Sequence, residues 1–112
     1  MSPTPREIAT RQLALYNARD LDGFCALFAP DARLIDLPSG QVLAAGAAEI
    51  RALYADRFSH EGLTCRVHAH CDIGAFAIDR ETVEGLPGGP ADILAIYRVE
   101  EGLIREVQFI RA

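Results

Sequence analysis

The chain has 112 residues, a formal net charge of −5 and a pI near 5.1, and 50% of its residues are hydrophobic. One domain with one core fits this length. The acidic balance argues against nucleic acid, whose protein partners are basic. No apolar run reaches the ~20 residues of a membrane span, and the start MSPTPREIATRQ lacks the regions of a signal peptide. We therefore expect a single cytoplasmic domain over residues 1–112, with no nucleic-acid or membrane partner.

Three helices are expected in the first half of the chain. Thr4-Pro5-Arg6-Glu7 has the pattern of a capping box with proline in the first turn, so a helix should follow to about Arg19. Asp20 can cap a second helix, whose apolar residues recur at helical spacing until Ala29-Pro30 ends it. An apolar stripe predicts a third helix over residues 47–58.

Extended segments account for the rest of the chain. A short strand is expected over residues 32–37, followed by the turn Pro38-Ser39-Gly40 and a second short piece at 41–45. After Gly62, alternating residues predict strands over 63–73, 75–84, 91–99 and 103–110. This order predicts an α+β fold, in which a curved antiparallel sheet carries three N-terminal helices across its concave face and forms a cone with a pocket.

The three cysteines and the neighbouring histidines do not predict a metal site. An odd number of cysteines, Cys25, Cys65 and Cys71, favours free thiols in a reducing compartment. In a regular strand, Cys65 and Cys71 share one face while His68 and His70 share the other, so the four side chains do not converge on an ion. We expect the Cys71 face to be core, no metal and no cofactor.

Asp36 is the residue on which a functional prediction depends. It lies between Ile35 and Leu37 of an expected strand, and a carboxylate is costly to bury unless something compensates it. Asp36 could cap the Pro38-Ser39-Gly40 turn. It could instead face an apolar cavity and move protons as a general base. The residues alone leave both interpretations open.

Two segments carry a resemblance to a known family. YNARDLDGFCALFAPDARLIDLPSG and AAGAAEIRALYADRF, followed by four expected antiparallel strands, resemble the nuclear transport factor 2-like superfamily with its cystatin-like fold. Within it, the chain is most similar to the ketosteroid isomerase and polyketide cyclase branch, called SnoaL-like. The resemblance covers nearly the whole chain and implies a pocket for a small apolar molecule. Because the fold hosts enzymes, binding proteins and assembly modules, it is less specific for function.

The resemblance also implies roles for particular residues. Ketosteroid isomerases have an aspartate general base on the corresponding strand, and that position falls on Asp36. This implies proton transfer of the steroid delta-isomerase type, from a carbon beside a carbonyl group. The donor tyrosine of the family falls near Gln12, and Tyr16 lies one turn later on the same helix face. Tyr54 matches a supporting tyrosine.

Other family donors are missing at the matching positions. Phe28 replaces a further tyrosine, and Ala95 stands where the family has a protonated acid.

Phe58 is expected to add to the apolar lining. His70 is a reserve candidate for acid–base work. Asp79 either forms a cross-strand ion pair or points into the cone, where it would supply the carboxyl that Ala95 lacks.

Three functions remain open from the sequence. The first is a cofactor-independent isomerase or cyclase that uses Asp36 and a tyrosine hydroxyl. The second is a pocket that binds a small apolar molecule without turnover, and the third is a dimeric interaction module. Apolar residues occupy both faces of the last two expected strands, over 91–99 and 103–110, and a sheet that is apolar on both sides is normally covered on both. We therefore expect a homodimer through the sheet.

Overall fold

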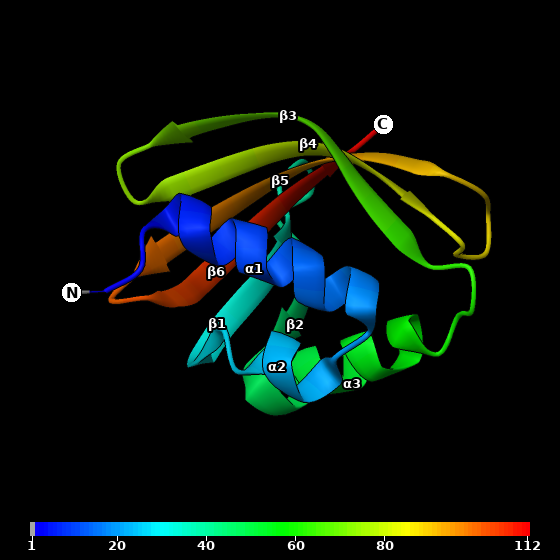
Figure 1. Ribbon diagram of the computed structural model, residues 1–112, viewed down its shortest axis with the longest axis horizontal. Helices are drawn as coiled ribbons and strands as arrows, with labels where there is room; N and C mark the ends of the chain where they lie inside the picture. The colour runs from blue at the N-terminus through cyan, green and yellow to red at the C-terminus, as the bar shows by residue number, and fades with distance from the viewer. Residues whose placement is uncertain (1) are drawn as a thin grey trace.

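The structure, a computed structural model, describes residues 2–112 as three helices and one six-stranded sheet (Figure 1). The helices are α1 (Pro5–Ala18), α2 (Leu21–Cys25) and α3 (Ala47–Phe58). The strands are β1 (Phe28–Asp36), β2 (Val42–Ala45), β3 (Thr64–Ile73), β4 (Phe76–Glu84), β5 (Ala91–Glu100) and β6 (Leu103–Arg111). This confirms the expected α+β fold class.

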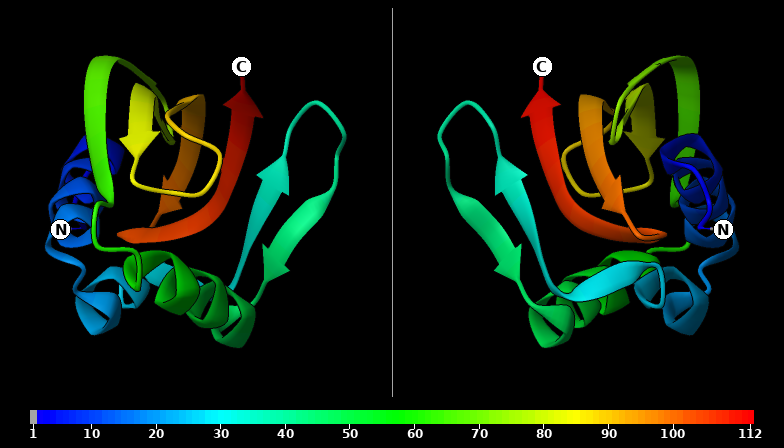
Figure 2. Two further views of the ribbon diagram at one scale, coloured as in Figure 1. Left: turned by 90° about the vertical axis from the view of Figure 1, so that its right-hand side faces the viewer. Right: turned by 90° about the vertical axis from the view of Figure 1, so that its left-hand side faces the viewer.

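The sheet is strongly curved and has the order β2-β1-β6-β5-β4-β3 (Figure 2). The chain passes from β3 to β6 through antiparallel hairpins, as expected. One pairing differs from an all-antiparallel sheet, because β1 runs parallel to β6. Helix α1 lies across the concave face against β3, β4 and β5, while α2 and α3 pack together below β1 and close that end of the cone.

Helix α1 begins where the sequence pattern indicates. The backbone N–H of Glu7 donates to Thr4 Oγ1 over 3.2 Å, and the Thr4 N–H donates to Glu7 Oε1 over 3.1 Å, which completes a capping box. Arg19 ends the helix in the left-handed conformation, with φ of 55°. No helix in the described part of the chain is long and apolar enough to span a membrane.

Helix α2 is shorter than its apolar spacing predicts. It ends at Cys25, and Phe28 is the first residue of β1 rather than the last of the helix. The backbone of Leu27 accepts a hydrogen bond from the Ile104 N–H over 2.8 Å, and Phe28 pairs with Ile104. Pairing with a strand distant in the sequence therefore overrides the local helical pattern. Pro30 lies in the stretch of β1 where the register with β6 is interrupted.

Strand β3 contains a bulge that the sequence analysis did not anticipate. Val67 pairs with Glu81 and Ala69 pairs with Arg80, so His68 is an extra residue without an opposite partner on β4. An extra residue exchanges the faces to which the following side chains point.

The bulge corrects the expected faces of β3. Before it, Cys65 lies opposite buried Val83, and after it His70 lies opposite buried Asp79. Cys65 and His70 therefore share the concave face. Cys71 and Ile73 point away from the core, and Ile73 is 69% exposed. The expectation of a core face around Cys71 is wrong.

Helix α1 is fastened to β3 and β4 by polar contacts. Arg6 forms ion pairs with Asp72 (Nη2–Oδ1, 2.7 Å) and with Asp79 (Nη1–Oδ1, 2.8 Å), and Asp79 is only 1% exposed. At the other end of the helix, Asn17 Nδ2 donates to the Cys65 carbonyl over 2.9 Å and Asn17 Oδ1 accepts from the Cys65 N–H over 2.8 Å. These contacts fix the helix that carries Gln12 and Tyr16.

Candidate functional site

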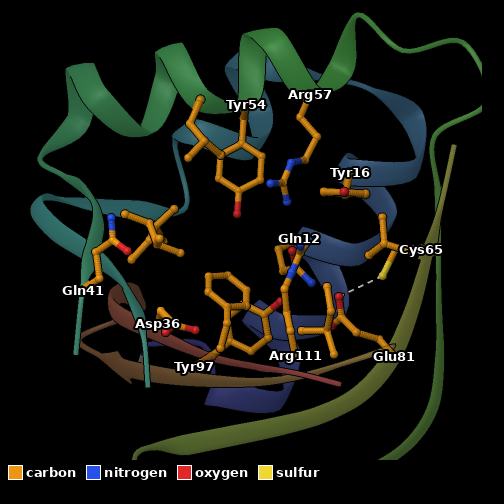
Figure 3. A pocket seen from close by; sticks show the side chains of 16 residues that line it. Gln12, Tyr16, Asp36, Gln41, Tyr54, Arg57, Cys65, Glu81, Tyr97 and Arg111 are labelled. Atoms are coloured by element: carbon orange, nitrogen blue, oxygen red, sulfur yellow. Dashed lines mark hydrogen bonds between the residues drawn. The ribbon is translucent and has the colours of Figure 1, made fainter. Parts of the chain in front are cut away.

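A cavity of about 310 Å³ lies between the concave face of the sheet and the helices α1 and α3 (Figure 3). Its volume falls at the low end of the ~300–1,000 Å³ typical of ligand pockets. The apolar part of its wall consists of Leu34, Leu43, Leu53, Val83, Ile93 and Phe109. The polar part consists of Gln12, Tyr16, Asp36, Gln41, Tyr54, Arg57, Cys65, Glu81, Tyr97 and Arg111.

Asp36 lines the cavity and also caps the turn that follows it. Its Oδ2 accepts hydrogen bonds from the Ser39 N–H over 3.1 Å and from Ser39 Oγ over 2.5 Å. The half-buried side chain therefore caps the turn and faces the cavity at the same time, and its role as a general base stays a prediction. The cap uses one oxygen, and Oδ1 has no hydrogen-bond partner among residues 2–112. One carboxylate oxygen is thus held in place while the other stays available.

Glu81 is a second carboxyl group in the same cavity, projecting from β4. Its side chain is buried, and Oε2 accepts a hydrogen bond from Cys65 Sγ over 3.1 Å. Its Oε1 finds no partner within the described residues. Burial raises the pKa of Glu81 to about 7, because an ionised carboxylate loses its hydration there. Near neutral pH, Glu81 therefore exists partly as a carboxylic acid that can donate a hydrogen bond.

Three buried tyrosines add hydroxyl groups to the wall. Burial raises the pKa of Tyr16 to about 12, and it also raises the pKa values of Tyr54 and Tyr97 above the ordinary range. All three hydroxyls therefore stay protonated and remain hydrogen-bond donors at physiological pH. The Tyr16 hydroxyl has no partner in the part of the chain that the structure describes. It is a buried donor available to a ligand.

The Cys65 thiol holds the Glu81 carboxyl group through its hydrogen bond and is not activated as a nucleophile. Burial and the neighbouring Glu81 carboxylate raise the pKa of its thiol, which therefore remains protonated. Within residues 2–112, no group of three or more His, Cys, Asp or Glu side chains is arranged to hold a metal ion.

A sequence profile described as the SnoaL-like domain matches residues 9–107. The chain belongs to the SnoaL-like family. No curated protein matches the sequence.

Several solved structures share the fold of this SnoaL-like chain. An uncharacterized cystatin-fold protein from Novosphingobium aromaticivorans is 25% identical with a TM-score of 0.88, over 98% of this chain and 100% of that one. A candidate ketosteroid isomerase from Kribbella flavida is 19% identical with a TM-score of 0.82, over 96% and 77%. A candidate polyketide cyclase from Sinorhizobium meliloti is 21% identical with a TM-score of 0.80, over 92% and 93%. The resemblance stated from the sequence is confirmed.

The fold of this SnoaL-like chain brings four of the proposed site residues to the cavity wall. Gln12 and Tyr16 reach it from α1, Tyr54 from α3 and Asp36 from the end of β1 (Figure 3). These side chains come from segments far apart in the sequence. Their roles toward a ligand stay predictions.

Two proposed lining residues belong to an aromatic cluster instead. Phe28 and Phe58 pack with Phe24, Tyr16 and Tyr54, with ring centroids 4.5 to 6.4 Å apart. The cluster joins the three helices to the start of β1, and its members other than Tyr16 and Tyr54 do not line the cavity. The rings support the floor of the cone from below.

The remaining three proposed residues lie elsewhere. Ala95 is fully buried and presents only a methyl group. Asp79 points inward, but its carboxylate is held in the ion pair with Arg6 rather than in the cavity, so it does not replace the acid missing at Ala95. His70 is exposed on the edge strand β3.

Sequence reasoning missed three charged groups of the cavity: Glu81, Arg57 and Arg111. The signal for Glu81 was the two-residue alternation of β4, which places it on the same face as buried Ala77 and Val83. Because the inward face of this strand was not known from the sequence, Glu81 was not predicted as a site residue.

Proposed function

We propose that this protein transfers a proton on a small apolar carbonyl compound, as a cofactor-independent isomerase or cyclase. The observation that carries the proposal is a pair of carboxyl groups, Asp36 and Glu81, in different surroundings within one largely apolar cavity. Asp36 is half-buried at the end of a strand, whereas Glu81 is buried and retains its proton up to about pH 7. Two carboxyl groups in unlike environments can divide the roles of base and acid.

In the proposed reaction, Asp36 acts as the base. Its free oxygen takes a proton from the carbon beside the substrate carbonyl, and the electron pair of that C–H bond moves onto the carbonyl oxygen. The resulting enolate oxygen is stabilised by hydrogen bonds from the Tyr16 hydroxyl and from protonated Glu81. Asp36 then returns the proton to a carbon one or two atoms away, so the product is an isomer of the substrate.

Glu81 compensates in this scheme for the donor that the sequence lacks. The resemblance puts the protonated acid of the family at Ala95, which lies opposite Asp79 on the neighbouring strand. Glu81 lies two residues further along β4 on the same face. The donors at Gln12 and Tyr16 are supplied by adjacent turns of α1.

The test measures turnover of a β,γ-unsaturated cyclic ketone to its conjugated isomer by ultraviolet absorbance. Asp36→Asn should lower the rate at least ~100-fold, since a positioned general base contributes about 10²–10⁴-fold. Its affinity for the conjugated product should stay within about threefold. Asp31→Asn, an exposed aspartate on the same strand, is the matched control and should keep full activity. Absence of turnover by the unaltered protein, or an unchanged rate in Asp36→Asn, contradicts the proposal.

A ligand-binding protein without turnover is the second candidate. It is favoured by the cap at Asp36, where Ser39 occupies one carboxylate oxygen, and by the loss of family donors at Phe28 and Ala95. In that case Asp36→Asn weakens binding of the ketone, and no chemistry is detected in either protein.

We also propose that the protein forms a homodimer through the convex face of its sheet. Half-buried Ile78, Leu94, Ile96 and Ile110 lie on that face, with Ile78 opposite Ile96 and Leu94 opposite Ile110. The concave face of the same strands is already core, so a partner is needed to cover this one. Free thiols at all three cysteines support the cytoplasm as its compartment.

A further inference from the structure

Two arginines project into the cavity from opposite walls. Arg57 reaches it from α3, and Arg111 reaches it from the last residue of β6 (Figure 3). Arg57 is half-buried, and its guanidinium carbon lies 5.7 Å from the centre of the Tyr54 ring. Neither side chain takes part in an ion pair with any of the described residues.

Carboxylates outnumber cations in this molecule. The chain has 16 Asp and Glu against 11 Lys and Arg, and four arginines away from the cavity are paired with carboxylates, whereas the two that line it are not. The acids of the cavity form no ion pair with either arginine within the described residues: Asp36 accepts its hydrogen bonds from Ser39, and Glu81 accepts from Cys65. The positive charge of Arg57 lowers the pKa of Glu81, although the effect of burial is larger. The two groups therefore interact electrostatically without forming an ion pair.

The two arginines also mark an end of the cavity. Both line a second, more open hollow of about 560 Å³, bordered by Leu86 and Pro90 of the β4–β5 connection and by Asp92 near the start of β5. The guanidinium groups therefore lie where the apolar cavity meets a polar surface hollow. An amphipathic ligand placed along this axis would have its apolar part against Tyr54, Leu34 and Phe109 and its polar end beside Arg57 and Arg111.

From this placement we infer that the ligand is an apolar carboxylic acid, whose carboxylate lies between Arg57 and Arg111 and whose hydrocarbon part fills the cavity. Arginine suits this role, because its planar guanidinium group donates paired hydrogen bonds to a carboxylate. The inference rests on the proposed function in one respect, that the cavity binds a small apolar molecule. A substrate of the proposed reaction would then carry its carboxylate away from the reacting carbonyl.

Isothermal titration calorimetry with matched probes tests the inference. The probes are octanoate, octan-1-ol and methyl octanoate, together with 2-naphthoate and its methyl ester. We expect each carboxylate to bind at least about tenfold more tightly than its neutral counterpart at low salt, and the advantage to shrink in ~0.5 M salt. Arg57→Gln and Arg111→Gln should each remove most of that advantage, and Arg57→Lys should retain part of it.

Arg80→Gln is the matched control, because Arg80 is exposed on β4 and lies outside the cavity. It should leave every affinity unchanged. The inference is overturned if an acid and its ester bind with equal affinity, or if no carboxylate binds at all. It is also overturned if the higher affinity for the carboxylate survives in the double variant Arg57→Gln/Arg111→Gln. Tight binding of the neutral probes alone would overturn it while leaving the pocket and the isomerase proposal intact. Carboxylate selectivity with no ketone turnover would instead uphold it and remove the isomerase proposal.

Discussion

Glu81 is a carboxyl group in an environment unlike that of an ordinary glutamate. Burial raises its pKa to about 7 from the usual 4.5, against weaker opposing effects of Cys65 and Arg57 and a supporting effect of Asp79. The folded protein therefore holds this proton more tightly than the unfolded chain does. Stability from this source is fully present below pH 4.5 and is lost as the pH rises through about 7.

This linkage gives a prediction for Glu81→Gln, which replaces the carboxyl group by an amide that cannot ionise. At pH 5 the free energy of unfolding should change little, whereas at pH 8 the variant should exceed the unaltered protein by roughly 2 kcal/mol. Urea denaturation at the two pH values measures the difference. Glu84→Gln, an exposed position on the same strand, should show no pH-dependent gain. An equal effect of Glu81→Gln at both pH values would contradict a buried, protonated Glu81.

The sequence predicted part of the site at this scale. Asp36 was indicated by its place between apolar residues of a strand and by the family resemblance, and Tyr16 and Tyr54 by helical spacing and the resemblance; all three line the cavity. Glu81 was not, since alternation along a strand tells which residues share a face but not which face lies inside. Arg111 was missed for a similar reason, because only the folded sheet brings the end of β6 to α3.

At the scale of elements, the position of α1 depends on a buried ion pair. Asp79 is almost wholly enclosed, and the guanidinium group of Arg6 is the cation that compensates it. Asp72 holds the same guanidinium from the surface. Removing one partner of a buried pair leaves an uncompensated charge, which is much worse than removing both.

Arg6→Ala should therefore lower the free energy of unfolding by about 3 kcal/mol. Arg11→Ala, an exposed arginine on the same helix, should change it by less than ~0.5 kcal/mol. Adding Asp79→Asn to Arg6→Ala should recover part of the loss, because the unpaired charge is then removed. Chemical denaturation of the four proteins checks this series. Equal losses in the two single arginine variants would mean that the pair does not anchor the helix.

Local patterns were sufficient for most elements. The capping box located the start of α1, and alternation located β3 to β6 within one or two residues. The end of α2 and the bulge at His68 escaped prediction because both are set by partners distant in the chain. Phe28 extends a helical pattern but pairs with Ile104, and His68 is extra only relative to β4.

At the scale of the whole molecule, one sheet serves two purposes. Its concave face forms the cavity wall, and its convex face carries the apolar patch formed by Ile78, Leu94, Ile96 and Ile110. The order of helices and strands predicted the cone. The parallel pairing of β1 with β6 could be seen only in the folded structure. No hairpin in the sequence specifies how the first and last strands meet.

The dimer prediction belongs to this scale. Ile96→Glu places a charge at the centre of the convex patch, and it should convert a dimer into a monomer in sedimentation velocity experiments. Val42→Glu, at an exposed position of the edge strand β2, which β1 separates from the strands of the patch, should remain dimeric. A monomeric unaltered protein, or a dimer that withstands Ile96→Glu, would exclude this interface.

The extra residue in β3 has a consequence for how the molecule coexists with its own copies. β3 is the outermost strand of the sheet, and such a border is a template onto which another polypeptide can add. The extra residue His68 shifts the register of the backbone N–H and C=O groups on its two sides. The backbone N–H and C=O of Cys65 are already hydrogen-bonded to the Asn17 side chain. An incoming segment would find no continuous row to match. The irregularity thus makes this border a poor template for another strand, and the dimer proposed above would use the convex face instead.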